Sequence, residues 1–225
     1  MKTLNIGIVA HVDAGKTSLT ERILYETHVI NEIGRVDKGN TQIDSMELEK
    51  RRGITIKASV VSFFVNDLKV NLIDTPGHAD FIAEVERSFR VLDGAILLLS
   101  AVEGIQAQTK ILLTVLRELA IPTIIFVNKI DRNGAQSTAL IKRIKQKLTE
   151  NVIALYSAEN RGTKHAFVVE NRLTNQDFRT EALNNYLPNG LNAFRVYISS
   201  TSFLPIHSAY PWGQSCSSVG AWPYR

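Results

Sequence analysis

The chain has 225 residues, of which 44% are hydrophobic and 21% are charged, so it can fold around one globular core. Its single cysteine excludes an internal disulfide and indicates a reducing, cytoplasmic location, and its apolar stretches are too short to span a membrane. The net charge of +4 permits contact with RNA but is too small to argue for it.

The first predicted elements are a buried strand near 4–10 and a helix near 16–26, joined by a short glycine-containing loop. Because a helix N-terminus presents backbone N–H groups and a positive dipole end, this junction suits a pyrophosphate. Lys16 would reach the β- and γ-phosphates, and the Thr17 hydroxyl would bind Mg²⁺. The predicted phosphate-binding residues are Ala10, His11, Val12, Asp13, Ala14, Gly15, Lys16 and Thr17.

Ala10 stands where this motif usually has a glycine. Because Ala10 ends the predicted strand, we expect no positive φ there, and the substitution should be tolerated.

Thr55 follows a charged stretch, residues 31–50, that has the composition of a mobile effector loop. A nucleotide switch needs a hydroxyl and a backbone N–H that hold Mg²⁺ and the γ-phosphate in one state only. Thr55 is our candidate for this role, and the alternative is an ordinary threonine at the start of an edge strand near 55–65.

A second buried strand is predicted near 70–73, and a helix is predicted near 80–92. The residues between them are candidates for the nucleotide site: Asp74, Thr75, Pro76, Gly77 and His78. Asp74 is placed to hold Mg²⁺, and the Gly77 N–H could approach a γ-phosphate. His78 takes the position of a residue that orients the attacking water, and it is the predicted catalytic residue.

A strand near 94–100, a helix near 106–119 and a further strand near 123–127 are predicted next. The last of these strands is followed by a motif that can recognise the base, namely Asn128, Lys129, Ile130 and Asp131. The Asp131 carboxylate can accept hydrogen bonds from the N1–H and 2-amino groups of guanine. Adenine lacks both donors and would leave a buried carboxylate unpaired. The motif therefore predicts GTP or GDP as the ligand.

These elements predict an α/β fold, namely the three-layer G domain of P-loop NTPases with a mostly parallel sheet and helices on both faces. A hairpin-like turn at Asn66 and Asp67 should add an antiparallel edge strand, and a further helix is expected near 135–148. The ligand should lie at the carboxyl ends of the strands.

The quoted motifs resemble the G domain of the translational GTPases of the elongation factor G group, and most of all the tetracycline-resistance ribosomal protection proteins. The opening 5–17, the segment 44–49 and the segment 70–81 carry this resemblance. Elongation factor G proper tends to have an aromatic residue at Ser45 and Met at Ile130, which favours the resistance branch. The resemblance implies a multidomain factor that binds the ribosome, hydrolyses GTP there and, in the resistance branch, dislodges tetracycline.

Residues 1–181 form the predicted G domain, and residues 182–225 form an irregular tail. The tail has no Asp, Glu or Lys but holds four of the six prolines, both tryptophans and the only cysteine. We interpret it as the product of a reading frame lost near residue 180, and the alternative is a loop-rich terminal subdomain. Because the tail has no acidic residues and no periodicity, we expect it not to supply the last strand and helix of the sheet.

Two Ser-Ala pairs could close over the guanine. Ser208 and Ala209 follow a segment that looks like the family's strand before this pair, and they are our choice. Ser157 and Ala158 lie nearer to Asp131, at a spacing suited to small signalling GTPases.

Three functions remain open at this stage. The first is a GTP hydrolase of the ribosomal protection type, acting with Mg²⁺ on the ribosome as a monomer without membrane or DNA partners. The second is an elongation factor G fragment, and the third is a catalytically idle nucleotide-binding remnant.

Overall fold

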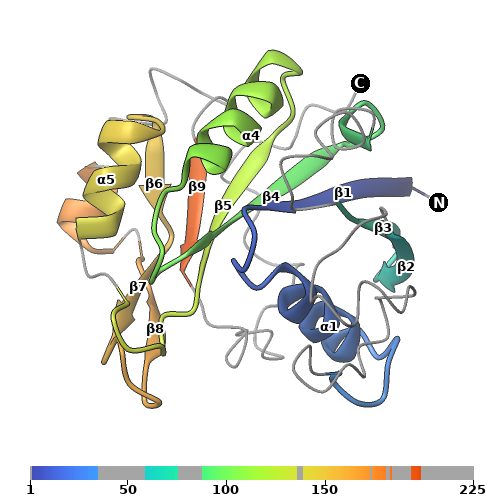
Figure 1. Cartoon of the computed structure of the whole chain (residues 1–225), viewed down its shortest axis with the longest axis horizontal. Coiled ribbons are helices and arrows are strands. Elements are labelled where there is room, and N and C mark those ends of the chain that lie inside the picture. The colour runs from blue at the N-terminus through green and yellow to red at the C-terminus, as the bar shows by residue number, and fades with distance from the viewer. Residues whose placement is uncertain are drawn as a thin grey trace.

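The computed structural model describes residues 2–34, 59–75, 88–135, 139–172, 174–180, 183 and 194–198 (Figure 1). Its strands are β1 (Lys2–Ala10), β2 (Ser59–Val65), β3 (Leu68–Asp74), β4 (Gly94–Ser100), β5 (Thr123–Asn128), β6 (Val152–Ala154), β7 (Tyr156–Glu159), β8 (Phe167–Glu170) and β9 (Phe194–Ile198). Its helices are α1 (Lys16–Glu26), α4 (Ala107–Glu118) and α5 (Ala139–Lys147). Within these described ranges, no helix has the length and apolarity to cross a membrane.

The central sheet has seven strands in the order β2-β3-β1-β4-β5-β9-β6. Only β2 runs antiparallel to its neighbour, because Asn66 adopts a positive φ of 51° and turns the chain directly back into β3. The remaining neighbours are parallel. The mostly parallel sheet and the antiparallel edge strand are therefore confirmed.

Alternation along the central strands creates a core on each face of the sheet. On one face, Val9, Leu97 and Val127 pack with residues of α4 and α5. On the other, Ile8, Leu98 and Phe126 pack with Leu19 and Leu24 of α1. Because successive side chains of a strand point to opposite faces, strands that are apolar throughout are buried on both sides. Figure 1 shows the resulting layers, with α4 and α5 on one side of the sheet and α1 on the other.

The helices follow the predicted pattern closely. Helix α1 spans the predicted residues 16–26, α4 occupies all but the ends of 106–119, and α5 lies within 135–148. Most of the predicted helix 80–92 lies outside the described residues, although Phe89 is buried in the core beside α4. In α5 the buried residues Leu140 and Ile144 are four positions apart, which is the spacing of one helix face and the pattern from which this helix was predicted.

Strands β7 and β8 form a separate two-stranded hairpin that the sequence did not predict (Figure 1). Ala158 and Ala166 are buried in the same hydrophobic core as residues of α4 and α5. The Asn171 side-chain amide donates to the Ala154 carbonyl at 2.7 Å, which ties the end of the hairpin to β6. Strands of four residues are too short to show a clear alternation of apolar and polar residues in the sequence, so their formation depends on packing against the core.

The expectation that the tail would not supply the last strand of the sheet is wrong. Strand β9 lies between β5 and β6 and pairs with both in parallel. Its five residues, 194–198, are aromatic and β-branched apart from Arg195, a composition that favours strands. The expectation was based on the composition of the whole tail, in which this short strand-forming segment is not apparent. The division of the chain at residue 181 stays a prediction.

Candidate functional site

The predicted motifs meet at one edge of the sheet, where the parallel strands β1, β3, β4 and β5 end. Ile8 of β1 is level with Asp74, the last residue of β3. Ser100, at the end of β4, is level with Asn128 at the end of β5. Loops that leave the carboxyl ends of neighbouring parallel strands converge, so residues from distant parts of the sequence come together here.

The phosphate loop turns tightly between β1 and α1. Asp13 and Gly15 both have positive φ, 63° and 93°, and the Ala14 N–H donates to the His11 carbonyl at 3.3 Å. A Cβ at position 15 would collide with the Asn128 side chain, so glycine is required both by its conformation and by this close approach. Ala10 ends β1 in strand conformation, as predicted. Helix α1 starts at Lys16, and its N-terminus gives the loop the backbone geometry that binds anions.

Lys16 and Asp74 form a buried ion pair in this structure. The Lys16 ammonium lies 2.5 Å from Asp74 Oδ1, and the side chains are only 8% and 1% exposed. The Thr75 hydroxyl donates to the Ile8 carbonyl at 2.8 Å, which locks the end of β3 beside the start of the phosphate loop. The phosphate-loop lysine and the predicted metal-binding carboxylate are therefore direct neighbours.

The guanine motif is joined to the phosphate loop through Asn128. Its buried side-chain amide donates to the Ala14 carbonyl at 3.0 Å, so the end of β5 is hydrogen-bonded directly to the phosphate loop. Lys129 adopts a positive φ of 61°, and Ile130 is buried in the core beside α4 and α5. Asp131 follows directly at this edge of the sheet and is partly exposed.

A further set of polar side chains gathers behind these loops. Glu103, in the turn after β4, lies 3.8 Å from His11 Nε2 and 3.3 Å from the Lys129 ammonium. His11 is buried, and its Nδ1 lies 3.4 Å from the Thr109 hydroxyl on α4. Burial lowers the pKa of His11 below 6.5, although the Glu103 carboxylate acts in the opposite direction.

Burial raises the pKa of Glu103, but hydrogen bonding from Ser100 and the charge of Lys129 outweigh it, so the pKa lies below 4.5. Glu103 is therefore held as a carboxylate between the Lys129 ammonium and the His11 imidazole, which its lowered pKa keeps uncharged at neutral pH. Neither Glu103 nor Thr109 was predicted as a site residue. The position of Glu103 after the strand near 94–100 was the available signal, because that strand ends at the same sheet edge.

The family model described as the elongation factor Tu GTP binding domain matches residues 1–208. The chain belongs to this family. The match continues past residue 181 and includes β9.

Among relatives of this GTP binding domain, the oxytetracycline resistance protein of Streptomyces rimosus is 60% identical over 166 residues, covering 74% of this chain and 25% of that protein. The tetracycline resistance protein TetP of Clostridium perfringens is 59% identical over 167 residues, covering 74% of this chain and 26% of that protein. The resemblance to tetracycline-resistance proteins is confirmed. The chain spans about a quarter of the length of these relatives.

A solved structure from Thermus thermophilus shares the fold of this GTP binding domain. Its TM-score is 0.75 at 23% sequence identity, covering 88% of this chain and 37% of that one. The predicted G-domain fold is therefore confirmed by an independent structural likeness.

Several predicted site residues lie outside the part of the chain that the structure describes. These are Thr55, Pro76, Gly77, His78, Ser208 and Ala209. The alternative guanine-closing pair lies in β7, where Ala158 is buried and the Ser157 hydroxyl lies 3.3 Å from the Asn171 side-chain oxygen. The choice between the two pairs stays a prediction.

Proposed function

We propose that this chain is the GTP-binding and GTP-hydrolysing domain of a ribosome-associated translation factor in the cytoplasm, of the tetracycline-resistance ribosomal protection type. The observation that carries the proposal is the hydrogen bond from Asn128 to Ala14, together with the Lys16–Asp74 ion pair. These two contacts bring the phosphate loop, the predicted metal carboxylate and the guanine motif to one sheet edge. The identity to proteins named for tetracycline resistance supports the choice of branch.

The binding steps follow from the residues at this edge. Backbone N–H groups of the loop 10–17 would hold the phosphates, and the Lys16 ammonium would exchange Asp74 for the β- and γ-phosphate oxygens. The Asp131 carboxylate would accept the guanine N1–H and 2-amino groups, with Ser208 and Ala209 closing the base pocket. The ligand class is therefore GTP or GDP.

The residues beside the phosphate loop also fit Mg²⁺. This ion prefers oxygen ligands, and the buried Asp74 carboxylate already accepts one cation, the Lys16 ammonium. Thr17 stands on the first turn of α1, next to Lys16. We propose that Thr17, Thr55 and Asp74 hold the ion. Bound Mg²⁺ would neutralise charge that develops on the phosphate oxygens.

His78 is the proposed catalytic residue. Its role would be to orient the water that attacks the γ-phosphate, and this step should be slow until the ribosome positions the histidine. Positioning of a water by one side chain contributes on the order of 10²-fold or more to such a rate.

GTP hydrolysis by the purified chain, measured with and without ribosomes, tests the proposal. We expect slow hydrolysis of GTP alone and a clear increase with ribosomes, with ATP as the matched control that should not be hydrolysed. Tight GTP binding without ribosome-stimulated turnover would instead identify a catalytically idle nucleotide-binding module. Release of labelled tetracycline from ribosomes, measured separately, tests the assignment to the resistance branch.

A further inference from the structure

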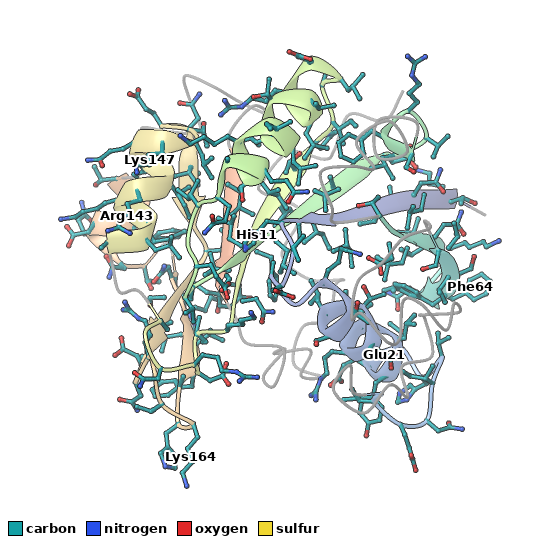
Figure 2. The ribbon with its side chains drawn as sticks, viewed as in Figure 1. His11, Glu21, Phe64, Arg143, Lys147 and Lys164 are labelled. Atoms are coloured by element: carbon teal, nitrogen blue, oxygen red, sulfur yellow. The ribbon has the colours of Figure 1, made fainter. Side chains whose placement is uncertain are left out.

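Glu103 connects two loops that both belong to the nucleotide site. One carboxylate oxygen lies 3.8 Å from His11 Nε2, at the start of the phosphate loop. The other lies 3.3 Å from the Lys129 ammonium, within the guanine motif. His11 and Lys129 are far apart in the sequence, so this single carboxylate joins segments that only the sheet brings together (Figure 2 places His11 near the centre of the molecule).

The turn after β4 gives Glu103 a fixed position. The Ser100 hydroxyl accepts from the N–H groups of Val102 and Glu103 at 3.2 and 3.3 Å, and the Gly104 N–H donates to the Ser100 carbonyl at 2.8 Å. Strand β4 pairs with β1 on one side and with β5 on the other. The turn therefore leaves the sheet between the two loops that Glu103 contacts.

The two neighbours of Glu103, His11 and Lys129, have fixed surroundings of their own. The Lys129 side chain packs near Gly15, while Asn128 holds the Ala14 carbonyl. His11 is 5% exposed and is braced on its other side by Thr109 of α4. A shift of the guanine motif would therefore lengthen the 3.3 Å ion pair between Glu103 and Lys129, which the carboxylate resists. A shift of the phosphate loop would move His11 away from the carboxylate, from which it is separated by 3.8 Å, more than a hydrogen-bond distance.

We propose that Glu103 is a positioning residue that fixes the phosphate loop and the guanine motif relative to each other, and so slows the release of guanine nucleotides. This inference rests on the proposed nucleotide binding but adds a residue outside the motifs from which that binding was predicted. In this role Glu103 acts through His11 and Lys129.

The size of the effect follows from exposure. The Glu103 and Lys129 side chains are 36% and 24% exposed, so water and salt screen their attraction, and its loss is worth less than that of a buried pair. We expect Glu103→Gln, which keeps the shape and removes the charge, to accelerate release of a fluorescent GDP analogue by about 2- to 5-fold.

The experiment measures GDP release by stopped flow on the full chain, for the unmodified protein, Glu103→Gln and Glu118→Gln. Glu118 is an exposed carboxylate at the end of α4, which leads to the start of β5 and not to its carboxyl end, and its substitution should leave the rate unchanged. The difference between Glu103→Gln and the unmodified protein should shrink at about 1 M salt, because screening weakens the same ion pair in the unmodified protein. A purely structural role for Glu103 would not show this salt dependence.

A double-mutant cycle identifies the partner. If Glu103 acts through Lys129, the effects of Glu103→Gln and Lys129→Met on release should not add. Should Glu103→Gln lose its cooperative thermal unfolding, Glu103→Met serves as a second neutral variant of similar size.

Equal release rates for the unmodified protein and a folded Glu103 variant would overturn the inference, as would additive effects in the cycle with no change in salt dependence. If the unmodified protein itself fails to bind the GDP analogue, the proposed function fails as well. Tight binding by the unmodified protein with no effect of Glu103 rejects the positioning role alone.

Discussion

The Lys16 ammonium lies 2.5 Å from Asp74 Oδ1, in an ion pair whose two side chains are almost fully buried. Lys16 begins α1 and Asp74 ends β3, so the pair joins the helix that follows the phosphate loop to the strand beside β1. Neither charge could remain in this position alone at low cost, because burial of an unpaired charge is strongly unfavourable.

The first prediction concerns this pair. Lys16→Met should lower the free energy of unfolding by about 3 kcal/mol, since it leaves the Asp74 carboxylate buried without its cation. It should also abolish tight GTP binding. Denaturant unfolding and GDP-analogue titration measure the two effects separately.

The double variant Lys16→Met with Asp74→Asn is the matched control. Removing both charges should restore most of the stability, while GTP binding stays lost. Recovery of binding together with stability would show that Lys16 has only a structural role.

The second prediction concerns the base. Asp131→Asn should weaken GTP binding and strengthen binding of xanthosine triphosphate, whose 2-oxo group matches an amide donor. The loss for GTP is expected to be on the order of 1–3 kcal/mol, the cost of leaving a buried polar group unpaired. Competition titrations with both nucleotides measure it, and an unchanged GTP affinity would remove Asp131 from base recognition.

The third prediction concerns hydrolysis. His78→Ala should leave GTP binding within a few-fold and lower ribosome-stimulated hydrolysis by at least roughly 10²-fold, the scale of one positioned catalytic group. Single-turnover hydrolysis with saturating ribosomes isolates this step. Full stimulated turnover by the alanine variant would exclude His78 from the mechanism.

The fourth prediction concerns pH. Burial lowers the pKa of folded His11 below 6.5, so the unfolded chain binds more protons once the pH falls below 6.5. The free energy of unfolding should therefore decrease as the pH falls through this value towards the lowered pKa. His11→Gln should remove this part of the pH dependence, measured by denaturant unfolding from about pH 7.5 to about pH 5.5.

The exposed His165, substituted by Gln in the same way, is the control for the His11 experiment. The Glu103 carboxylate contributes in a separate window, because its lowered pKa adds stability that is lost only as the pH falls below 4.5. An identical pH dependence for the unmodified protein and His11→Gln would show that His11 is not the group responsible.

The sequence by itself determined the ligand class and most of the sheet. The phosphate loop and the guanine motif are local patterns, since backbone N–H groups at a helix start and a carboxylate after a buried strand depend on a few adjacent residues. Strongly apolar strands such as β4 and an amphipathic helix such as α4 are also local signals, and their bounds were predicted closely.

Only the tertiary structure decided which distant residues meet. The motifs predicted that Lys16 and Asp74 belong to one site, but not that the ammonium pairs directly with this carboxylate. Nothing in the sequence shows that Glu103 lies between His11 and Lys129. Strand β9 has five residues in a segment of unusual composition, and its place between β5 and β6 depends on backbone pairing with both. Such contacts form between residues that are far apart along the chain, so they depend on long-range packing. A local pattern of residue types does not identify a contact partner that is distant in the sequence.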